Sequence, residues 1–226
     1  TRSFHVTGVQ TCALPIYDAA ASALRSAMQT VKIKKGEDLF KEGDDGHHLY
    51  VIIEGKIKLG TKSVDGRENL LSVLGPGEMF GELSLFDPGP RTSTATAVTD
   101  ARLLSLGHNQ VIPWVKDHPE VSLQLLGRLA QRLRRTNEAV GDLVFSDVPG
   151  RVAKALIDLG TRFGTSKDDG LHVNHDLTQE ELAQLVGASR ETVNKALADF
   201  AGRGWLRLEA RAVVVLDYER LSKRGR

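Results

Sequence analysis

The sequence lacks the features of several protein classes. Its 226 residues include a single cysteine, Cys12, and only 5% aromatic residues. One cysteine cannot form an intramolecular disulfide, a zinc knuckle or the thiolate cluster of an iron–sulfur centre. No run approaches the ~18 apolar residues of a membrane-spanning helix, and no basic segment followed by an apolar one opens the chain. These absences predict a cytoplasmic protein without membrane spans.

The sequence also has no excess of one charge. It carries 30 basic and 29 acidic residues, which gives a formal net charge of +1 at neutral pH. A nucleic-acid function must therefore rest on local geometry, not on bulk basicity. The hydrophobic content of 41% is sufficient for two modest domains with ordinary cores.

The first sixteen residues have neither helical nor strand periodicity. The run VTGVQTCALPI, residues 6–16, resembles the translation of a sequencing-adapter oligonucleotide. We therefore expect residues 1–16, including Cys12, to be non-native and the native sequence to begin near Tyr17.

The middle of the chain has the pattern of an antiparallel β domain. An alanine-rich segment, Asp18 to Met28, predicts a short helix before it. Short runs of β-forming residues separated by glycines then predict a β-roll or jelly roll. These runs are Leu49 to Ile53, Ile57 to Leu59, Leu70 to Leu74 and Ala101 to Leu106.

Two helices are predicted after the strands, a short one at His108 to Val115 and a long one from Pro119 to Phe145. The long helix has Leu126, Leu129, Leu133, Thr136, Val140 and Leu143 at alternating spacings of three and four, the pattern of a coiled-coil seam. A helix of roughly 40 Å is longer than a small β-roll needs as cover. We expect a parallel homodimer; the alternative is that the stripe packs on its own β-roll.

Ser146 to Gly150 contains proline and glycine, which predicts a helix break and a hinge between domains. An amphipathic helix from Arg151 to Gly164 and a polar loop to Asp176 are expected to follow.

The C-terminal region has a helix-turn-helix pattern. Thr178 and Glu181 form a predicted capping box, Gly187 is expected to end that helix, and Ser189 is expected to cap a second one. The segment SRETVNK, residues 189–195, places polar side chains on the first turns of the second helix, where they can reach base edges in the major groove. The stretches Trp205 to Leu208 and Val213 to Leu216 predict a β-hairpin wing.

Two motifs in this order resemble those of the cyclic-AMP receptor (Crp/Fnr) family of transcription regulators, with the actinobacterial branch the most similar. GEMFGELSLFDPGPRTST, residues 77–94, is similar to the family's phosphate-binding cassette. LTQEELAQLVGASRETVNKAL, residues 177–197, is similar to its helix-turn-helix. The resemblance implies a cyclic-AMP-responsive homodimeric regulator, not an enzyme, that binds a palindromic TGTGA-like operator and contacts RNA polymerase.

The same resemblance assigns a cyclic-AMP site without a metal. Its expected residues are Gly81, Glu82, Leu83, Arg91, Thr92, Thr136 and Asn137. Arginine suits a cyclic phosphate, and a carboxylate can accept the proton of the ribose 2′-hydroxyl. The adenine contacts are implied for Thr136 and for Asn137 of the partner subunit, where the best-studied relatives carry serine. The alternatives are that Arg91 is a solvated loop cation and that Thr136 only sets the register of the seam.

The resemblance also assigns the DNA contacts. The expected residues are Thr178, Gln179, Ser189, Arg190, Glu191, Thr192, Asn194 and Lys195. Arg190 suits guanine and Glu191 suits cytosine, whereas Ser189 and Thr192 position the backbone. Lys195 stands where many relatives have arginine. The alternative is that Arg190 and Glu191 only pair with each other on the surface.

The predicted fold class is α+β. The expected divisions are the non-native segment 1–16, a nucleotide-binding β-roll at 17–118, a dimerisation helix at 119–146 and a winged helix-turn-helix domain at 147–226. Two other functions stay open. One is a regulator of the same family that responds to cyclic GMP or to no ligand. The other is a cupin-type metal enzyme using His47, His48 and Glu54, although adjacent histidines in a strand point to opposite faces.

Overall fold

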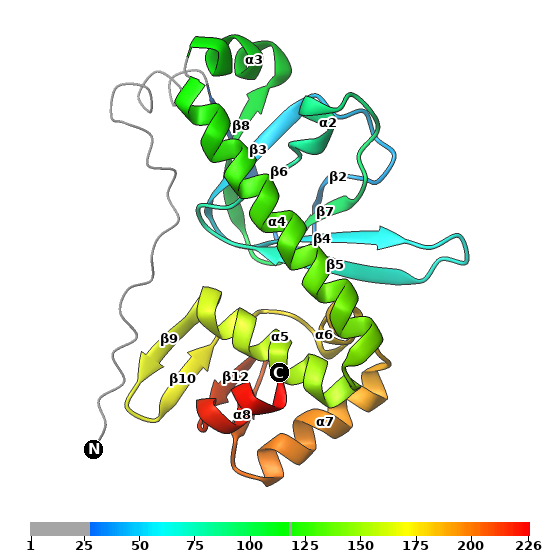
Figure 1. The fold of residues 1–226 in the computed structure, drawn as a ribbon, viewed down its shortest axis with the longest axis vertical. Coiled ribbons are helices and arrows are strands. Elements are labelled where there is room, and N and C mark those ends of the chain that lie inside the picture. Colours follow the sequence, from blue (N-terminus) through cyan, green and yellow to red (C-terminus); the bar gives the residue numbers. More distant parts are fainter. Residues whose placement is uncertain (1–27, 118) are drawn as a thin grey trace. The chain divides into compact units, whose positions relative to one another are not determined.

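The computed structural model describes residues 28–117 and 119–226 (Figure 1). They form two compact units, one made mainly of residues 28–137 and the other mainly of residues 138–226. The expected non-native segment 1–16 and nearly all of the helix predicted at Asp18 to Met28 lie outside the described residues.

Two antiparallel four-stranded sheets form the β-roll of the first unit. One has the order β1, β8, β3, β6 and the other has the order β2, β7, β4, β5. The strands are β1 (Gln29–Ile33), β2 (Asp38–Phe40), β3 (His48–Glu54), β4 (Ile57–Lys62), β5 (Glu68–Leu74), β6 (Met79–Phe80), β7 (Thr94–Ala97) and β8 (Ala101–Gly107). This architecture confirms the predicted antiparallel β-roll.

The four predicted strand runs lie within β3, β4, β5 and β8. Their β-branched and leucine side chains fill the space between the sheets, because alternate residues of a strand face the same side. Ile52 of β3 is opposite Leu103 of β8, and both are fully buried. Phe80 of β6 completes this core.

Among its described residues, three helices belong wholly or partly to this unit. α2 (Leu83–Phe86) is a single turn inside the cassette, and α3 (His108–Asp117) follows β8. α4 (Pro119–Phe145) has the bounds predicted from the sequence, and the division between the two units falls within it, after Asn137.

The second unit places four helices around a sheet of order β11, β12, β10, β9. Its elements after α4 are α5 (Val148–Phe163), β9 (Gly164–Lys167), β10 (Gly170–Val173), α6 (Gln179–Val186), α7 (Arg190–Gly202), β11 (Leu206–Glu209), β12 (Ala212–Val215) and α8 (Tyr218–Arg224). Leu156 of α5, Phe200 of α7 and Val214 of β12 are buried in its core.

Two local predictions for this unit were wrong. The segment after α5 is not a polar loop up to Asp176: it forms the β9–β10 hairpin, and β10 pairs with β12, so that Val173 lies opposite Val213. The helix break is also shorter than predicted. Only Ser146 and Asp147 separate α4 from α5, and Pro149 lies in the first turn of α5, where its missing N–H is not needed.

The β-roll is tightly packed around Gly55, which lies between β3 and β4, but not around Gly36. Gly36 and Gly55 both have positive φ angles, +83° and +86°. A Cβ at Gly36 would meet open space, whereas one at Gly55 would lie 2.4 Å from the Asp100 carbonyl oxygen. Gly36→Ala should cost about 1 to 2 kcal/mol of unfolding free energy from backbone strain alone. Gly55→Ala should cost clearly more in the same chemical denaturation, and equal losses would contradict this packing.

Candidate functional site

A pocket in the first unit collects most of the predicted nucleotide-binding residues. Its lining is Phe40, Leu59, Gly81, Glu82, Leu83, Ser84, Arg91, Thr92, Ser93 and Arg132. The five predicted residues of the cassette, Gly81, Glu82, Leu83, Arg91 and Thr92, therefore all line this one pocket. Thr136 and Asn137 are not part of this lining and are exposed on α4.

Arg91 is buried in the wall of this pocket, with 5% of its surface exposed. Its Nη1 donates to the Gly81 carbonyl at 2.9 Å and its Nη2 to the His48 carbonyl at 2.8 Å. The guanidinium carbon lies 4.2 Å from the centre of the Phe40 ring, a cation–π contact. Burial lowers the pKa of Arg91, yet a guanidinium remains charged at neutral pH. The alternative that Arg91 is a solvated loop cation is wrong.

Arg91 also has an unused donor. Its Nε is buried and has no hydrogen-bond partner among the described residues. A buried donor without a partner costs about 1 to 3 kcal/mol, so a ligand that accepts from it is favoured.

Glu82 is the second buried charge, with 1% of its surface exposed. Its Oε1 accepts from Arg132 Nη1 at 2.5 Å, and its Oε2 is buried without a partner in the described part of the chain. The pocket thus contains two groups without a hydrogen-bond partner among the described residues: the Nε donor of the Arg91 cation and the Oε2 acceptor of the Glu82 anion.

The backbone at Gly81 brings these groups together. Gly81 has a φ of +80°, and a Cβ there would lie 2.7 Å from Arg91 Nη1 and 2.9 Å from the His48 carbonyl oxygen. No other residue type allows this turn together with this close approach. Glu82 follows at the start of α2.

Sequence reasoning missed Arg132, which reaches the pocket from α4. The available signal was its spacing: Arg132 stands four residues before Thr136, on the same helix face. The Thr136 hydroxyl donates to the Arg132 carbonyl at 3.0 Å, within its own helix.

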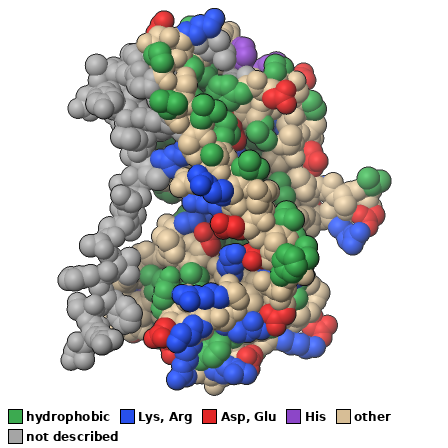
Figure 2. Space-filling model, viewed as in Figure 1, with side chains coloured by type: hydrophobic (Ala, Val, Ile, Leu, Met, Phe, Trp, Pro, Cys, Tyr) green, Lys and Arg blue, Asp and Glu red, His purple; other side chains and the backbone are tan. Residues whose placement is uncertain are grey.

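The predicted seam of α4 is exposed in the single chain. Leu126, Leu133, Val140 and Leu143 are 55% to 61% exposed, which contradicts the alternative that they pack on their own β-roll. Figure 2 shows hydrophobic and basic side chains along the face on which α4 lies. Such an apolar stripe is typical of a surface that pairs with another protein chain.

The second unit presents the predicted helix-turn-helix. The Thr178 hydroxyl accepts from the Glu181 N–H at 3.1 Å, and the Glu181 carboxylate accepts from the Thr178 N–H at 2.7 Å, so the capping box is confirmed. Gly187 ends α6 with a φ of +64°, as a left-handed cap. Ser189 caps α7 by accepting from the Thr192 N–H at 3.2 Å.

The first turns of α7 expose a polar surface. Ser189, Arg190, Glu191, Thr192 and Lys195 are exposed, as is Gln179 at the start of α6, and Thr178 is half-buried. Glu191 pairs with Lys195 at 2.8 Å, whereas Arg190 is exposed and forms no ion pair with Glu191 among the described residues. The alternative in which Arg190 pairs with Glu191 is therefore wrong.

Asn194 departs from its prediction. It is half-buried and its Oδ1 is buried without a partner within the described residues, so it does not lie on the outward face. The reason is its place at the edge of the buried face of α7, one residue after Val193 and three residues before Leu197, both of which are buried.

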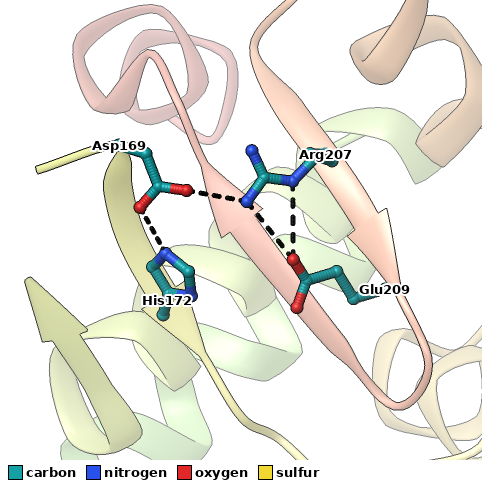
Figure 3. A network of polar contacts seen from close by, with 4 residues as sticks. All are labelled: Asp169, His172, Arg207 and Glu209. Carbon is teal, nitrogen blue, oxygen red and sulfur yellow. Dashed lines mark hydrogen bonds and ion pairs between the residues drawn. The ribbon is translucent and has the colours of Figure 1, made fainter. Parts of the chain in front are cut away.

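A polar network joins the β9–β10 turn to the wing (Figure 3). Asp169 accepts from Arg207 of β11 at 2.8 Å and lies 2.6 Å from His172 Nε2, and Arg207 also pairs with Glu209 at 3.3 Å. Hydrogen bonds from Arg207 and His172 lower the pKa of the Asp169 carboxyl from 3.8 to about 2. Glu209 precedes a tight two-residue turn to β12, in which Arg211 has a φ of +57°.

Comparison with known proteins identifies the two halves of this arrangement. A family profile described as a cyclic nucleotide-binding domain matches residues 30–118, and one described as a Crp-like helix-turn-helix domain matches residues 150–224. The chain belongs to the Crp/Fnr family. This confirms the resemblance found in the sequence, and with it the prediction of a transcription regulator and not an enzyme.

Several Crp/Fnr relatives are similar over most of their length. The CRP-like cAMP-activated global transcriptional regulator of Mycobacterium tuberculosis is 58% identical over 92% of this chain and 93% of its own. The cyclic AMP receptor protein of Thermus thermophilus is 38% identical over 81% of this chain and 82% of its own. Among solved structures, the c-di-GMP responsive global regulator CLP of Xanthomonas campestris has a TM-score of 0.77 at 25% identity, covering 88% of this chain and 98% of that one.

The described residues offer no support for a metal site of the cupin type or for a membrane span. Within residues 28–117 and 119–226, no group of three or more His, Cys, Asp or Glu side chains could hold a metal ion. None of the described helices is long and apolar enough to cross a membrane. The Crp/Fnr assignment, which rests on two matching domains, replaces the cupin interpretation of His47, His48 and Glu54.

The network at Asp169 predicts a pH dependence of stability. Because its pKa is lower in the folded chain, the ionised carboxyl contributes stability above about pH 4, and this contribution is lost as pH falls toward 2. Asp169→Asn should lower the melting temperature of this Crp/Fnr chain near neutral pH, and the difference from the wild type should shrink between about pH 4 and 2.

The neighbouring Asp168 is exposed and is not one of the residues of this network, so it is the matched control. Asp168→Asn should leave the melting temperature unchanged across this range. A difference for Asp169→Asn that is the same at every pH would contradict the role of the ionised carboxyl.

Proposed function

We propose that the chain is a cyclic-AMP-responsive homodimeric regulator that binds a palindromic TGTGA-like operator. The observation that carries the proposal is the pair of unused groups in one buried pocket, Arg91 Nε and Glu82 Oε2. A ligand that satisfies both needs an anion and a hydroxyl in close proximity. A ribose cyclic phosphate has this combination.

In the proposed complex the phosphate accepts from the Arg91 guanidinium, a charge-assisted bond, and from the Thr92 hydroxyl. The ribose 2′-hydroxyl donates to Glu82. Gly81 and Leu83 contribute their backbone at the turn into α2. The M. tuberculosis relative, named a cAMP-activated regulator, supports this ligand.

The adenine contacts require a second copy of the chain. Thr136 and Asn137 are exposed on α4 beside the apolar stripe, so pairing of two α4 helices would bring Thr136 close to Asn137 of the partner subunit. In this arrangement residues 17–118 bind the nucleotide, residues 119–146 pair, and residues 147–226 bind DNA.

The DNA contacts follow from the exposed start of α7. In the proposed complex Arg190 reads guanine and Glu191 reads cytosine, while Ser189, Thr192, Thr178 and Gln179 hold the backbone. The Oδ1 atom of Asn194 is buried, so this atom cannot read a base without a rearrangement. Lys195 is held by Glu191 and contacts a phosphate.

Two such helices in a dimer read half-sites one DNA turn apart, roughly 34 Å. The proposed setting is the cytoplasm, with RNA polymerase as a further partner.

A second candidate is the same regulator with another cyclic nucleotide. Cyclic GMP has the same ribose and cyclic phosphate, so Arg91 and Glu82 do not distinguish it. The similar X. campestris structure is named a c-di-GMP responsive global regulator, which supports this second candidate.

Calorimetric titration of the purified full chain with cyclic AMP, cyclic GMP and cyclic di-GMP separates these candidates. It is followed by operator binding with and without each nucleotide. Micromolar or tighter binding of cyclic AMP that also tightens operator binding supports the first proposal. Binding of another nucleotide alone supports the second, and binding of none contradicts both.

Arg91→Leu should abolish cyclic-AMP binding and leave the dimer intact, because Arg91 lies in the pocket and not on the exposed stripe of α4. Calorimetry measures the first and analytical ultracentrifugation the second. Arg102→Leu, which removes an exposed arginine paired with Glu54, should bind cyclic AMP normally. Retained binding in Arg91→Leu would remove the basis of the proposed site.

Arg190→Ala should cost ~1 to 3 kcal/mol of binding free energy at the operator and much less on random DNA. Fluorescence anisotropy with both duplexes gives the two numbers. Arg203→Ala, at the other end of α7 and paired with Asp199, should not change the preference between the two duplexes. An equal loss on both duplexes for Arg190→Ala would assign Arg190 to the phosphate backbone instead of to a base.

A further inference from the structure

Arg151 makes an unusual set of contacts near the start of α5. Three different nitrogens of its guanidinium each donate to a main-chain carbonyl: Nε to Val186 at 2.8 Å, Nη1 to Ser146 at 2.7 Å and Nη2 to Gly187 at 3.2 Å. Val186 is the last residue of α6 and Gly187 is its cap, while Ser146 directly follows α4. One half-buried cation therefore binds the ends of two helices.

The same physical effect favours Arg151 at the end of α4 and at the end of α6. The last carbonyls of a helix lack partners within the helix and carry partial negative charge, so a cation placed there is favoured. The planar fork of arginine can address three carbonyls in different directions, whereas the single ammonium of lysine cannot. Arg151 thus connects the end of α4 to the turn between α6 and α7.

A second contact links the end of α4 to the turn between α6 and α7. A Cβ built on Gly187 would lie 2.8 Å from Leu143 Cδ2, so the turn of the helix-turn-helix passes directly against α4. Asp142 of α4 also pairs with Lys154 of α5 at 2.6 Å. All of these residues belong to the second compact unit, which contains the last turns of α4.

We propose that Arg151 is the positioning residue that fixes the helix-turn-helix relative to the end of α4, and that the effect of the nucleotide on operator binding depends on it. The inference rests on the proposed function, in which α4 carries the nucleotide contacts and α7 the DNA contacts. Arg151 touches neither ligand. Its removal leaves three carbonyls without their donor and lets the turn move independently of α4.

The test uses full-length wild type, Arg151→Gln, Arg151→Lys and the control Arg162→Gln. Arg162 lies on the same helix and pairs with Asp158 one turn away. For each chain, calorimetry gives the cyclic-AMP affinity and anisotropy gives the operator affinity with and without cyclic AMP. Thermal unfolding shows whether each variant is folded.

Arg151→Gln should reduce the cyclic-AMP-dependent gain in operator affinity by about tenfold, while the affinity for cyclic AMP stays within about twofold of wild type. Arg151→Lys should lose part of the gain, because it keeps the charge but not the fork. Arg162→Gln should keep the full gain. If Arg151→Gln does not fold, the partial loss in Arg151→Lys carries the test.

Three results would overturn the inference. One is a full gain in folded Arg151→Gln, or in Arg151→Lys where only that variant folds. Another is an equal loss of operator affinity with and without cyclic AMP, which would show a purely structural role. A third is a loss of cyclic-AMP binding itself. A wild type that binds the operator equally well with and without cyclic AMP would instead refute the proposed function, and this inference with it.

Discussion

The pocket of the β-roll depends on a buried positive charge, Arg91, for which no ion pair is found among the described residues. Arg91 is removed from water, and the protein compensates with two carbonyl oxygens and the face of Phe40, which leaves Nε without a partner. Both carbonyls can lie this close to the guanidinium because Gly81 has a positive φ and no Cβ, which would lie within 3 Å of Arg91 Nη1 and of the His48 carbonyl oxygen. Burial of an incompletely compensated charge is costly, so Arg91 lowers the stability of the unit unless a ligand accepts from its Nε, as the proposed cyclic phosphate would.

The buried negative charge of Glu82 connects this pocket to α4. Glu82 is also buried, and its partner Arg132 comes from α4, the helix that continues into the second unit. A ligand that changes the hydrogen bonding of the Glu82 carboxylate therefore acts directly on Arg132, and so on α4. The same helix carries the exposed apolar stripe, and the residue that follows it, Ser146, accepts a hydrogen bond from Arg151. In the proposed function, nucleotide binding, dimer pairing and DNA binding therefore all involve α4.

Features with a local physical cause were predictable from the sequence. The bounds of α4, the capping box of Thr178 and Glu181 and the left-handed Gly187 follow from periodicity and from hydrogen bonds between close neighbours. The β9–β10 hairpin was missed because its polar residues form a strand only where β12 offers a partner. Arg132 and the burial of Asn194 Oδ1 were missed for a related reason: each depends on how a helix face is turned toward distant residues, which sequence spacing does not specify.

The two arginines that organise this chain share one feature. The acceptors of Arg91 and of Arg151 are main-chain carbonyls, supplied by His48, Gly81, Ser146, Val186 and Gly187. Nearly every amino acid offers the same carbonyl, so the side chains at His48, Ser146 and Val186 can change during evolution without loss of these bonds. Tolerance to mutation is thus distributed unevenly. It is broad around each guanidinium and minimal at the arginines and at the glycines whose backbone shape only glycine adopts cheaply.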